Sequence, residues 1–138
     1  MDNWPEFIKQ HFMTVPFIRF FDAVVVETTR GRSLLTVPMR AEFANSYGMT
    51  HGGVVAALVD MAAGIALRTL KVRVVTVETT VNYFLPVTTD DSLTAEARLV
   101  HEGRKLLHAE VDVVNGESTL VAKGRAVFYV TGEDTGEY

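Results

Sequence analysis

The sequence predicts an α+β domain in which one long helix lies against an antiparallel sheet. Three observations lead to this: the chain has one long apolar segment near its middle, strands with period-two alternation follow it, and the connections between those strands are short. A chain of 138 residues is long enough to bury one core. We therefore expect a single domain that spans residues 1–138.

The first part of the chain is predicted to be a short helix followed by a hairpin. The helical segment covers residues 1–15, with Asn3 as its cap. Two β-branched and aromatic runs, 16–29 and 32–39, then flank the Arg30–Gly31 pair, which is typical of a hairpin turn.

Further strands are predicted after Lys71, where the apolar pattern changes to a period of two. They occupy the segments 72–86, 92–102, 104–114 and 119–130. Because the turns between them are short, we expect consecutive strands to be antiparallel neighbours that share one apolar face. The last residues, 131–138, are expected to form a loose tail.

The long helical candidate runs from Thr50, a plausible cap, to about Thr69. It is apolar all round until Arg68, apart from Asp60. At about 100° per residue, the residues within about 60° of Asp60 are Gly53, Ala56, Ala57, Ala63, Gly64 and Leu67. A helix of this composition is covered on every side, so one face must meet the sheet. Small residues permit close approach, so we expect the face around Asp60 to meet another subunit or a ligand.

Asp60 lies in the middle of this small-residue face, where an unpaired carboxylate is costly. Burial should raise its pKa unless a donor satisfies it. A structural Asp, bonded to a backbone amide or to an arginine of a partner, explains the residue as well as a catalytic Asp does. The helix pattern alone leaves both interpretations open.

The residues just before the helix supply a second candidate feature. They are Asn45, Tyr47, Gly48, Thr50, His51, Gly52 and Gly53. Free N–H groups at a helix start can donate to a polarised carbonyl oxygen, and the paired glycines, Gly52 and Gly53, leave no Cβ in the way of a substrate. A tight turn against a neighbouring strand would also explain the glycines. Asp60 is about 12 Å farther along the helix axis, too far for one side chain to reach both places.

The composition excludes several classes of function. A formal net charge of −4 argues against nucleic acid or an anionic membrane as the main partner. The chain has no cysteine, which excludes thiolate catalysis and suits a cytoplasmic location. The apolar stretch 54–67 is too short to span a membrane. The histidines are scattered rather than spaced as a ligand set, so we expect no metal ion.

Residues 45–67, NSYGMTHGGVVAALVDMAAGIAL, resemble the signature of hotdog-fold thioesterases. The resemblance is to the phenylacetate-degradation-related (PaaI-like) branch of the 4-hydroxybenzoyl-CoA thioesterase superfamily. In that branch an Asn, a Gly and then His-Gly-Gly lead into a helix with an Asp nine residues after the His, and this chain matches in type and spacing. The similarity continues through TVETTVNYFLP, GRKLLHAEVDV and LVAKGRAVFYV, so it covers nearly everything after about residue 16.

The resemblance implies a hotdog fold, a long helix wrapped by a curved antiparallel sheet, paired into dimers or dimers of dimers with active sites between subunits. It implies an acyl-CoA thioesterase in which Asp60 is the nucleophile or the general base for water. Coenzyme A is then part of the substrate, and no cofactor is needed. The Gly52 N–H would polarise the thioester carbonyl, and Asn45 would help to place substrate or water. Thr76 stands where relatives carry a hydroxyl that orients water from the partner subunit, although some have Ser there.

Other candidate residues have less specific signals. His51 is expected to fix the loop or to bond a backbone carbonyl beside the substrate site rather than to transfer protons, since it is predicted to point away from the helix acid. Gly53 would leave room for substrate. Arg104 and Lys105 follow a glycine turn and either bind the phosphates of coenzyme A or are simply solvated. Glu78 is expected in the subunit seam, where it pairs across the dimer or acts in catalysis. The candidate lining residues of the acyl pocket are Phe43, Leu67 and Phe84.

Two rival functions stay open on the sequence. A hotdog hydratase or dehydratase needs an acid and a histidine that converge on the substrate, whereas His51 and Asp60 are predicted to point apart. A non-catalytic acyl-CoA binder would keep the pocket but would not need Asp60.

Overall fold

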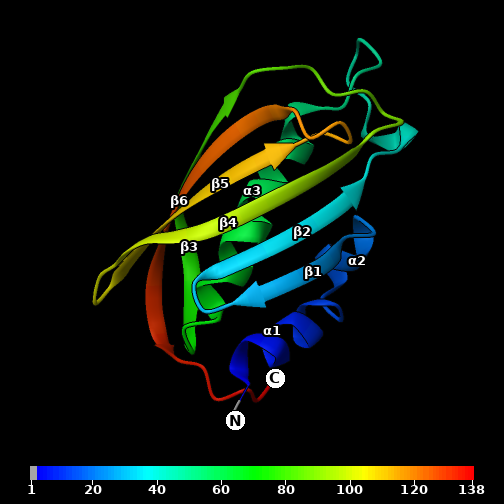
Figure 1. Cartoon of the computed structure of the whole chain (residues 1–138). Coiled ribbons are helices and arrows are strands. Elements are labelled where there is room, and N and C mark those ends of the chain that lie inside the picture. Colours follow the sequence, from blue (N-terminus) through cyan, green and yellow to red (C-terminus); the bar gives the residue numbers. More distant parts are fainter. Residues whose placement is uncertain (1–2) are drawn as a thin grey trace.

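A computed structural model describes residues 3–138 and shows a curved antiparallel sheet wrapped around one long helix (Figure 1). The helices are α1 (Trp4–Phe12), α2 (Pro16–Phe20), a short 3-10 turn (Ala41–Phe43) and α3 (Gly52–Arg68). The strands are β1 (Val24–Thr29), β2 (Arg32–Pro38), β3 (Val72–Tyr83), β4 (Ser92–Glu102), β5 (Leu106–Val114) and β6 (Leu120–Glu133). The predicted α+β architecture is confirmed.

The sheet has the strand order β1-β2-β4-β5-β6-β3, and every neighbouring pair is antiparallel. The predicted hairpin of β1 and β2 is confirmed, and its turn has a φ of 75° at Gly31, where glycine is favoured. The expectation that consecutive strands are neighbours holds from β4 to β6 but is wrong for β3. Residues 84–91 cross over the start of α3, where the Thr50 N–H donates to Val87 O at 2.8 Å, and β3 pairs with β6 instead. β3 is therefore an edge strand.

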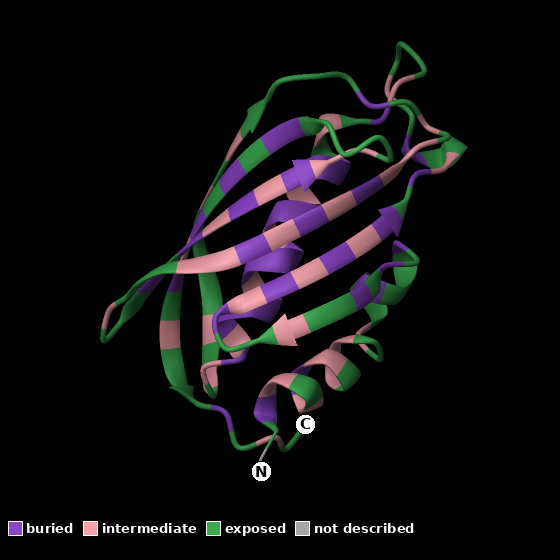
Figure 2. Ribbon diagram, in the orientation of Figure 1, coloured by how far each residue is buried: buried purple, intermediate pink, exposed green. Residues whose placement is uncertain are grey.

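The inner face of the sheet and α3 together form the core. Alternate residues of β2, β4 and β5 are buried, and Figure 2 shows them as alternating bands along these strands. The intervening residues face outward and carry ion pairs, such as those of Arg98 with Glu110 and Asp112, both at 3.2 Å. Helix α3 packs tightly on β6, since a Cβ on Gly124 would lie 2.4 Å from Cγ1 of Val59. A side chain at Gly124 would push the helix away.

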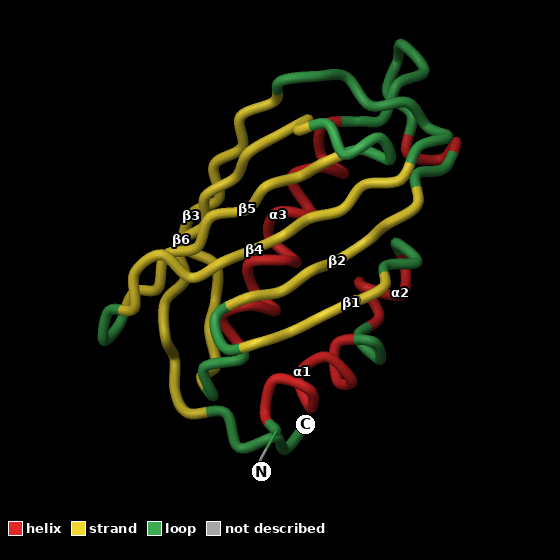
Figure 3. Tube along the Cα trace, viewed as in Figure 1, coloured by secondary structure: helices red, strands yellow, loops and turns green. Residues whose placement is uncertain are grey.

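The N-terminal segment is partly as predicted. Helix α1 begins with Asn3 as its cap, and Asn3 Oδ1 accepts the Glu6 N–H at 3.3 Å. Residues 16–20, expected to be part of the first strand, form α2 instead. Pro16 has the fixed φ that suits a helix start, and Ile18 packs into the core, so burial outweighs the strand propensity of the aromatic residues. Figure 3 shows α1 and α2 beside β1, at the sheet edge opposite β3.

The end of the chain was expected to be a loose tail over residues 131–138, and this is wrong. β6 continues into the segment, and the side chain of Asp134 is fully buried. Its carboxylate accepts hydrogen bonds from Arg68 Nε at 2.8 Å and from the Tyr138 hydroxyl at 2.7 Å. The Tyr138 ring stacks on His11 with the ring centroids 4.0 Å apart. These contacts hold the last residues between α1 and the end of α3.

Candidate active site

Helix α3 begins at Gly52, and His51 is its cap. His51 Nδ1 accepts the Gly53 N–H at 2.8 Å, which assigns the ring proton to Nε2 in the neutral side chain. Thr50, the expected cap, does not have that role. It is buried, and its N–H and hydroxyl donate to carbonyls of the connection that crosses the helix start. The His51 side chain thus binds a backbone N–H of the helix start, and its place in a substrate site stays a prediction.

The helix start leaves the Gly52 N–H free. None of the hydrogen bonds among residues 3–138 uses this group. Tyr83, the last residue of β3, donates its hydroxyl to Gly52 O at 2.8 Å, and its ring lies 3.5 Å from the position of a Cβ on Gly52. The sequence did not identify Tyr83, because a strand pattern does not show which strand end meets the helix.

Asn45 organises the loop before the helix. Its Oδ1 accepts the N–H groups of Tyr47 at 2.8 Å and Met49 at 3.1 Å. The side-chain oxygen is therefore occupied by the loop itself. The NH2 group is the part that can contact a ligand in the cavity of about 530 Å³ that Asn45 shares with Gly52 and Tyr83.

Asp60 is held by β3. Its Oδ1 accepts hydrogen bonds from the hydroxyls of Thr76 at 2.8 Å and Thr79 at 3.3 Å, which are the donors that a carboxylate on an apolar helix needs. In a regular strand, residues three apart point to opposite faces. A β-bulge at Val77 shifts the register between Thr76 and Glu78 and so turns both threonines toward the helix. Thr76 contacts the Asp60 of its own chain, whereas the resemblance had implied a hydroxyl from the partner subunit.

The helix face around Asp60 is the part of α3 that the sheet covers least, and we call it the open face. Gly53 is exposed, and its neighbours on this face are only half-buried: Ala56, Ala57, Asp60 and Gly64. Ala63 and Leu67, which were assigned to the same face, are fully buried. Gly52 and Asp60 are eight residues apart on one straight element, about 12 Å along its axis. One chain therefore does not bring the free N–H and the carboxylate together.

Arg104 and Lys105 lie far from the helix start of their own chain. Both are exposed in the turn between β4 and β5, at the end of the sheet opposite the Asn45 loop (Figure 1). Lys105 Nζ lies 5.9 Å from the centroid of the Tyr129 ring. In a single chain these two cations therefore do not join Gly52.

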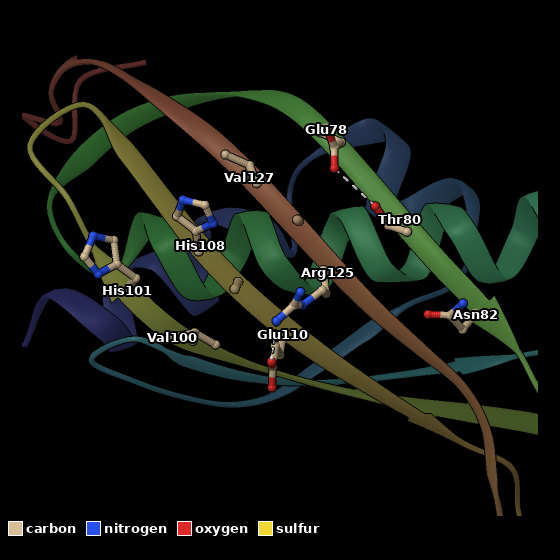
Figure 4. A pocket seen from close by; sticks show the side chains of 11 residues that line it. Glu78, Thr80, Asn82, Val100, His101, His108, Glu110, Arg125 and Val127 are labelled. Carbon is tan, nitrogen blue, oxygen red and sulfur yellow. Dashed lines mark hydrogen bonds and ion pairs between the residues drawn. The ribbon is translucent and has the colours of Figure 1, made fainter.

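A separate cavity of about 660 Å³ lies on the outer face of the sheet, and Figure 4 shows helix α3 behind that sheet. Glu78 lines this cavity with His101 and His108, and its Oε1 accepts the Thr80 hydroxyl at 3.3 Å. Glu78 thus points away from Asp60, which leaves it no contact with the helix acid within one chain.

The three residues expected to line an acyl pocket do not line one common cavity. Phe84 lines the cavity beside Gly52, and Phe43 lines a second cavity on the other side of the helix start. Leu67 is fully buried in the core and lines neither cavity.

Two kinds of feature are absent from the described part of the chain, residues 3–138. No group of three or more His, Asp or Glu side chains is placed there to hold a metal ion. No helix there is both long enough and apolar enough to cross a membrane.

Sequence comparison assigns the family. A family model described as Thioesterase superfamily matches residues 47–122, more than half of the chain. The chain belongs to the thioesterase superfamily. A putative esterase of Saccharolobus solfataricus is 34% identical over 110 residues, which cover 78% of this chain and 73% of that protein. The acyl-coenzyme A thioesterase PaaI of Escherichia coli is 26% identical over 114 residues, which cover 82% of this chain and 81% of that protein.

Solved structures of this superfamily share the fold. The structure of the E. coli PaaI protein superposes with a TM-score of 0.89 at 22% identity, over 96% of this chain and 97% of that chain. A hypothetical thioesterase of Streptococcus pneumoniae, solved with coenzyme A, gives a TM-score of 0.80 at 29% identity, over 82% of this chain and 91% of that chain. The predicted hotdog fold, the PaaI-like branch and the class of enzyme, a thioester hydrolase, are confirmed.

Proposed function

We propose that this chain hydrolyses the thioester bond of an acyl- or aryl-CoA to the free acid and coenzyme A. The observation that carries the proposal is the Asp60 carboxylate, held by two threonine hydroxyls on the open face of a helix whose start offers the free Gly52 N–H. The E. coli relative named as an acyl-CoA thioesterase and the S. pneumoniae structure with coenzyme A support the substrate class.

A carboxylate and an N–H donor are the groups that this reaction needs. In one route Asp60 takes a proton from the water that attacks the carbonyl carbon, and in the other Asp60 attacks first and water then hydrolyses the anhydride. Negative charge develops on the carbonyl oxygen, where the Gly52 N–H stabilises it. The carbon–sulfur bond breaks, and the thiolate leaves readily because thiol pKa values are near 8.5. Coenzyme A belongs to the substrate, so this step uses no cofactor.

We propose that the two halves of each site come from two copies of the chain. The free N–H and the carboxylate are about 12 Å apart within one α3, so a thioester bound at Gly52 needs the Asp60 of a partner subunit. β3 offers the surface for such a partner, because it is an edge strand on which Val75 and Val77 are 53% and 59% exposed. Unpaired backbone groups on an exposed edge strand favour pairing with another strand.

The test combines two variants that each damage one half of the site. Asp60→Asn removes the carboxylate. Gly52→Pro removes the N–H, and the backbone tolerates it because the first helical position suits proline and His51 before it has an extended ψ of 137°. Gly52→Ala is the matched control, since it keeps the N–H and its Cβ makes only ordinary contact with Tyr83 at 3.5 Å.

We expect each variant alone to release almost no thiol from short, medium, long or aromatic acyl-CoA, while Gly52→Ala stays active. After unfolding and refolding together, Asp60→Asn and Gly52→Pro should form mixed dimers with one intact site in two. Random pairing makes half of the dimers mixed, so about a quarter of the wild-type activity should return.

Full activity of Asp60→Asn would refute the role of Asp60. No recovery in the refolded mixture, with mixed dimers present, would refute the shared site. Binding of acyl-CoA by the wild type without thiol release would favour the non-catalytic binder.

A further inference from the structure

A second cavity, of about 380 Å³, opens beside the helix start on the side of Gly53 and Ala57. Its walls are aromatic, with Phe17, Phe20 and Phe21 from α2 and its C-terminal turn and Phe43 from the 3-10 turn before α3. Gly53 and Ala57 also belong to the open face of α3 that carries Asp60. An acyl group whose thioester lies at the helix start can therefore extend into this cavity, which is of the size of small ligand pockets.

One cation lies among these aromatic rings. The guanidinium carbon of Arg40 is 4.9 Å from the centroid of the Phe20 ring and 4.4 Å from that of Phe43. Its Nε is buried and has no hydrogen-bond partner among residues 3–138. Within residues 3–138, Arg40 forms a long ion pair, in which Nη1 lies 3.5 Å from the exposed carboxylate of Asp22. Nε thus keeps its donor unused within the described residues, although the Arg40 side chain as a whole is 30% exposed.

We propose that this cavity holds the far end of the acyl group and that Arg40 selects acyl groups that end in an anionic oxygen, the ω-carboxyacyl thioesters. This rests on the proposed thioesterase function. Methylene groups of the acyl chain pack against the phenylalanines. The terminal carboxylate accepts two parallel hydrogen bonds from the N–H groups of the planar Arg40 guanidinium. A buried donor without a partner is costly, so a ligand that supplies the acceptor is favoured over one that does not.

Two carboxylates of the chain lie near Arg40 and oppose an anionic ligand. Asp22 is exposed and pairs at 3.5 Å only, and Glu42 lines the cavity from an exposed position. Within the described residues, the 3.5 Å ion pair with Asp22 is the guanidinium's contact with these carboxylates, and Nε has no hydrogen-bond partner. A ligand carboxylate can therefore take the donor positions that both leave open.

The experiment compares thioesters that differ only at the acyl end. Thiol release is measured as kcat/KM for adipoyl-CoA and hexanoyl-CoA, with the succinyl/butyryl and suberoyl/octanoyl pairs to find the length that fits. Arg40→Met fills the space between the Phe20 and Phe43 rings without the charge. Arg40→Lys keeps the charge without the planar guanidinium that can donate two parallel hydrogen bonds. Arg19→Gln is the control, because Arg19 is an exposed cation of helix α2, whose phenylalanines line the cavity, and does not line the cavity itself.

For the wild type we expect the dicarboxylic member to be preferred at one length. Arg40→Met should lower that preference by about 10- to 100-fold while it changes hydrolysis of the monocarboxylic thioester only slightly, as expected for loss of a charge-assisted hydrogen bond. Arg40→Lys should fall between, and Arg19→Gln should match the wild type.

Calorimetric titration of Asp60→Asn, with and without Arg40→Met, measures the same preference without turnover. An equal loss for both members of each pair would overturn the proposal, because Arg40 would then act on coenzyme A phosphates or on the loop. A wild type that prefers the monocarboxylic thioester at every length, in hydrolysis and in titration, would overturn it as well. If no thioester is hydrolysed, the proposed function fails, and the titration still decides the role of Arg40.

Discussion

Replacing Gly124 with alanine is expected to destabilise the protein, because this glycine lies where α3 presses on β6. The new methyl carbon would lie 2.4 Å from Cγ1 and 2.8 Å from Cγ2 of Val59, far inside the contact distance of two carbon atoms. Val59 is fully buried, and a β-branched side chain in a helix has one strongly preferred rotamer. The clash can therefore be relieved only by moving the helix away from the sheet.

The expected size follows from two opposing effects. Overpacking of this kind costs about 1–3 kcal/mol, and the loss of glycine's freedom in the unfolded chain returns about 0.4–1 kcal/mol. Gly132 in the same strand is the matched control, because an added Cβ there meets nothing within 4 Å. Gly124→Ala should be less stable than Gly132→Ala by about 1–3 kcal/mol. With an unfolding entropy of about 0.3 kcal/mol per kelvin for a chain of this length, the Tm difference is roughly 3–10 °C.

Thermal unfolding followed by circular dichroism measures this difference, at one protein concentration because subunit association shifts Tm. Adding Val59→Ala to Gly124→Ala removes the clashing methyl groups and should return part of the lost stability, which appears as a coupling free energy in a double-mutant cycle. Equal Tm values for the two glycine variants would refute the tight contact. Since Asp60 follows Val59, Gly124→Ala should also lower kcat.

Thr76→Val should lower kcat about 10- to 100-fold with little change in KM, because Asp60 loses its 2.8 Å hydrogen bond while the side-chain shape stays. Thr76→Ser keeps the hydroxyl and should keep the activity. A valine variant as active as the serine variant would contradict this role of Thr76. Burial alone would raise the pKa of Asp134, but hydrogen bonds from the Tyr138 hydroxyl and a backbone N–H, with the Arg68 guanidinium, hold it below its ordinary value. The stability from this lowered pKa is full above about pH 4 and is lost as the pH falls through the pKa of the folded state. Urea unfolding of Asp134→Asn should therefore show a shallower loss of stability at acid pH than the wild type, and parallel pH curves would count against the contact.

The sequence was sufficient for those features that depend on local pattern. Period-two alternation gave the strands and their buried faces, because successive side chains of a strand point to opposite sides. The stripe of Gly53, Ala57 and Gly64 around Asp60 gave the open side of α3, because spacing on a helix fixes which residues share a face. The free N–H at Gly52 follows from the geometry of any helix start.

Other features depend on contacts between distant segments, which no local pattern specifies. The Phe-rich run at 16–20 has strand propensity, yet burial of Ile18 makes it helical. The last residues look like a solvated tail, yet Asp134 is tied to the end of α3. His51 replaces Thr50 as the cap because Thr50 is used to hold the crossing connection.

The site shows the same division. The sequence determined that an acid lies on the small-residue face of a helix that begins with a free donor. Only the tertiary structure decided what holds that acid, because Thr79 faces Asp60 through a β-bulge at Val77 that depends on pairing with β6. Alternation specifies the two faces of a strand, whereas its neighbours and its bulges are set by packing across the whole sheet.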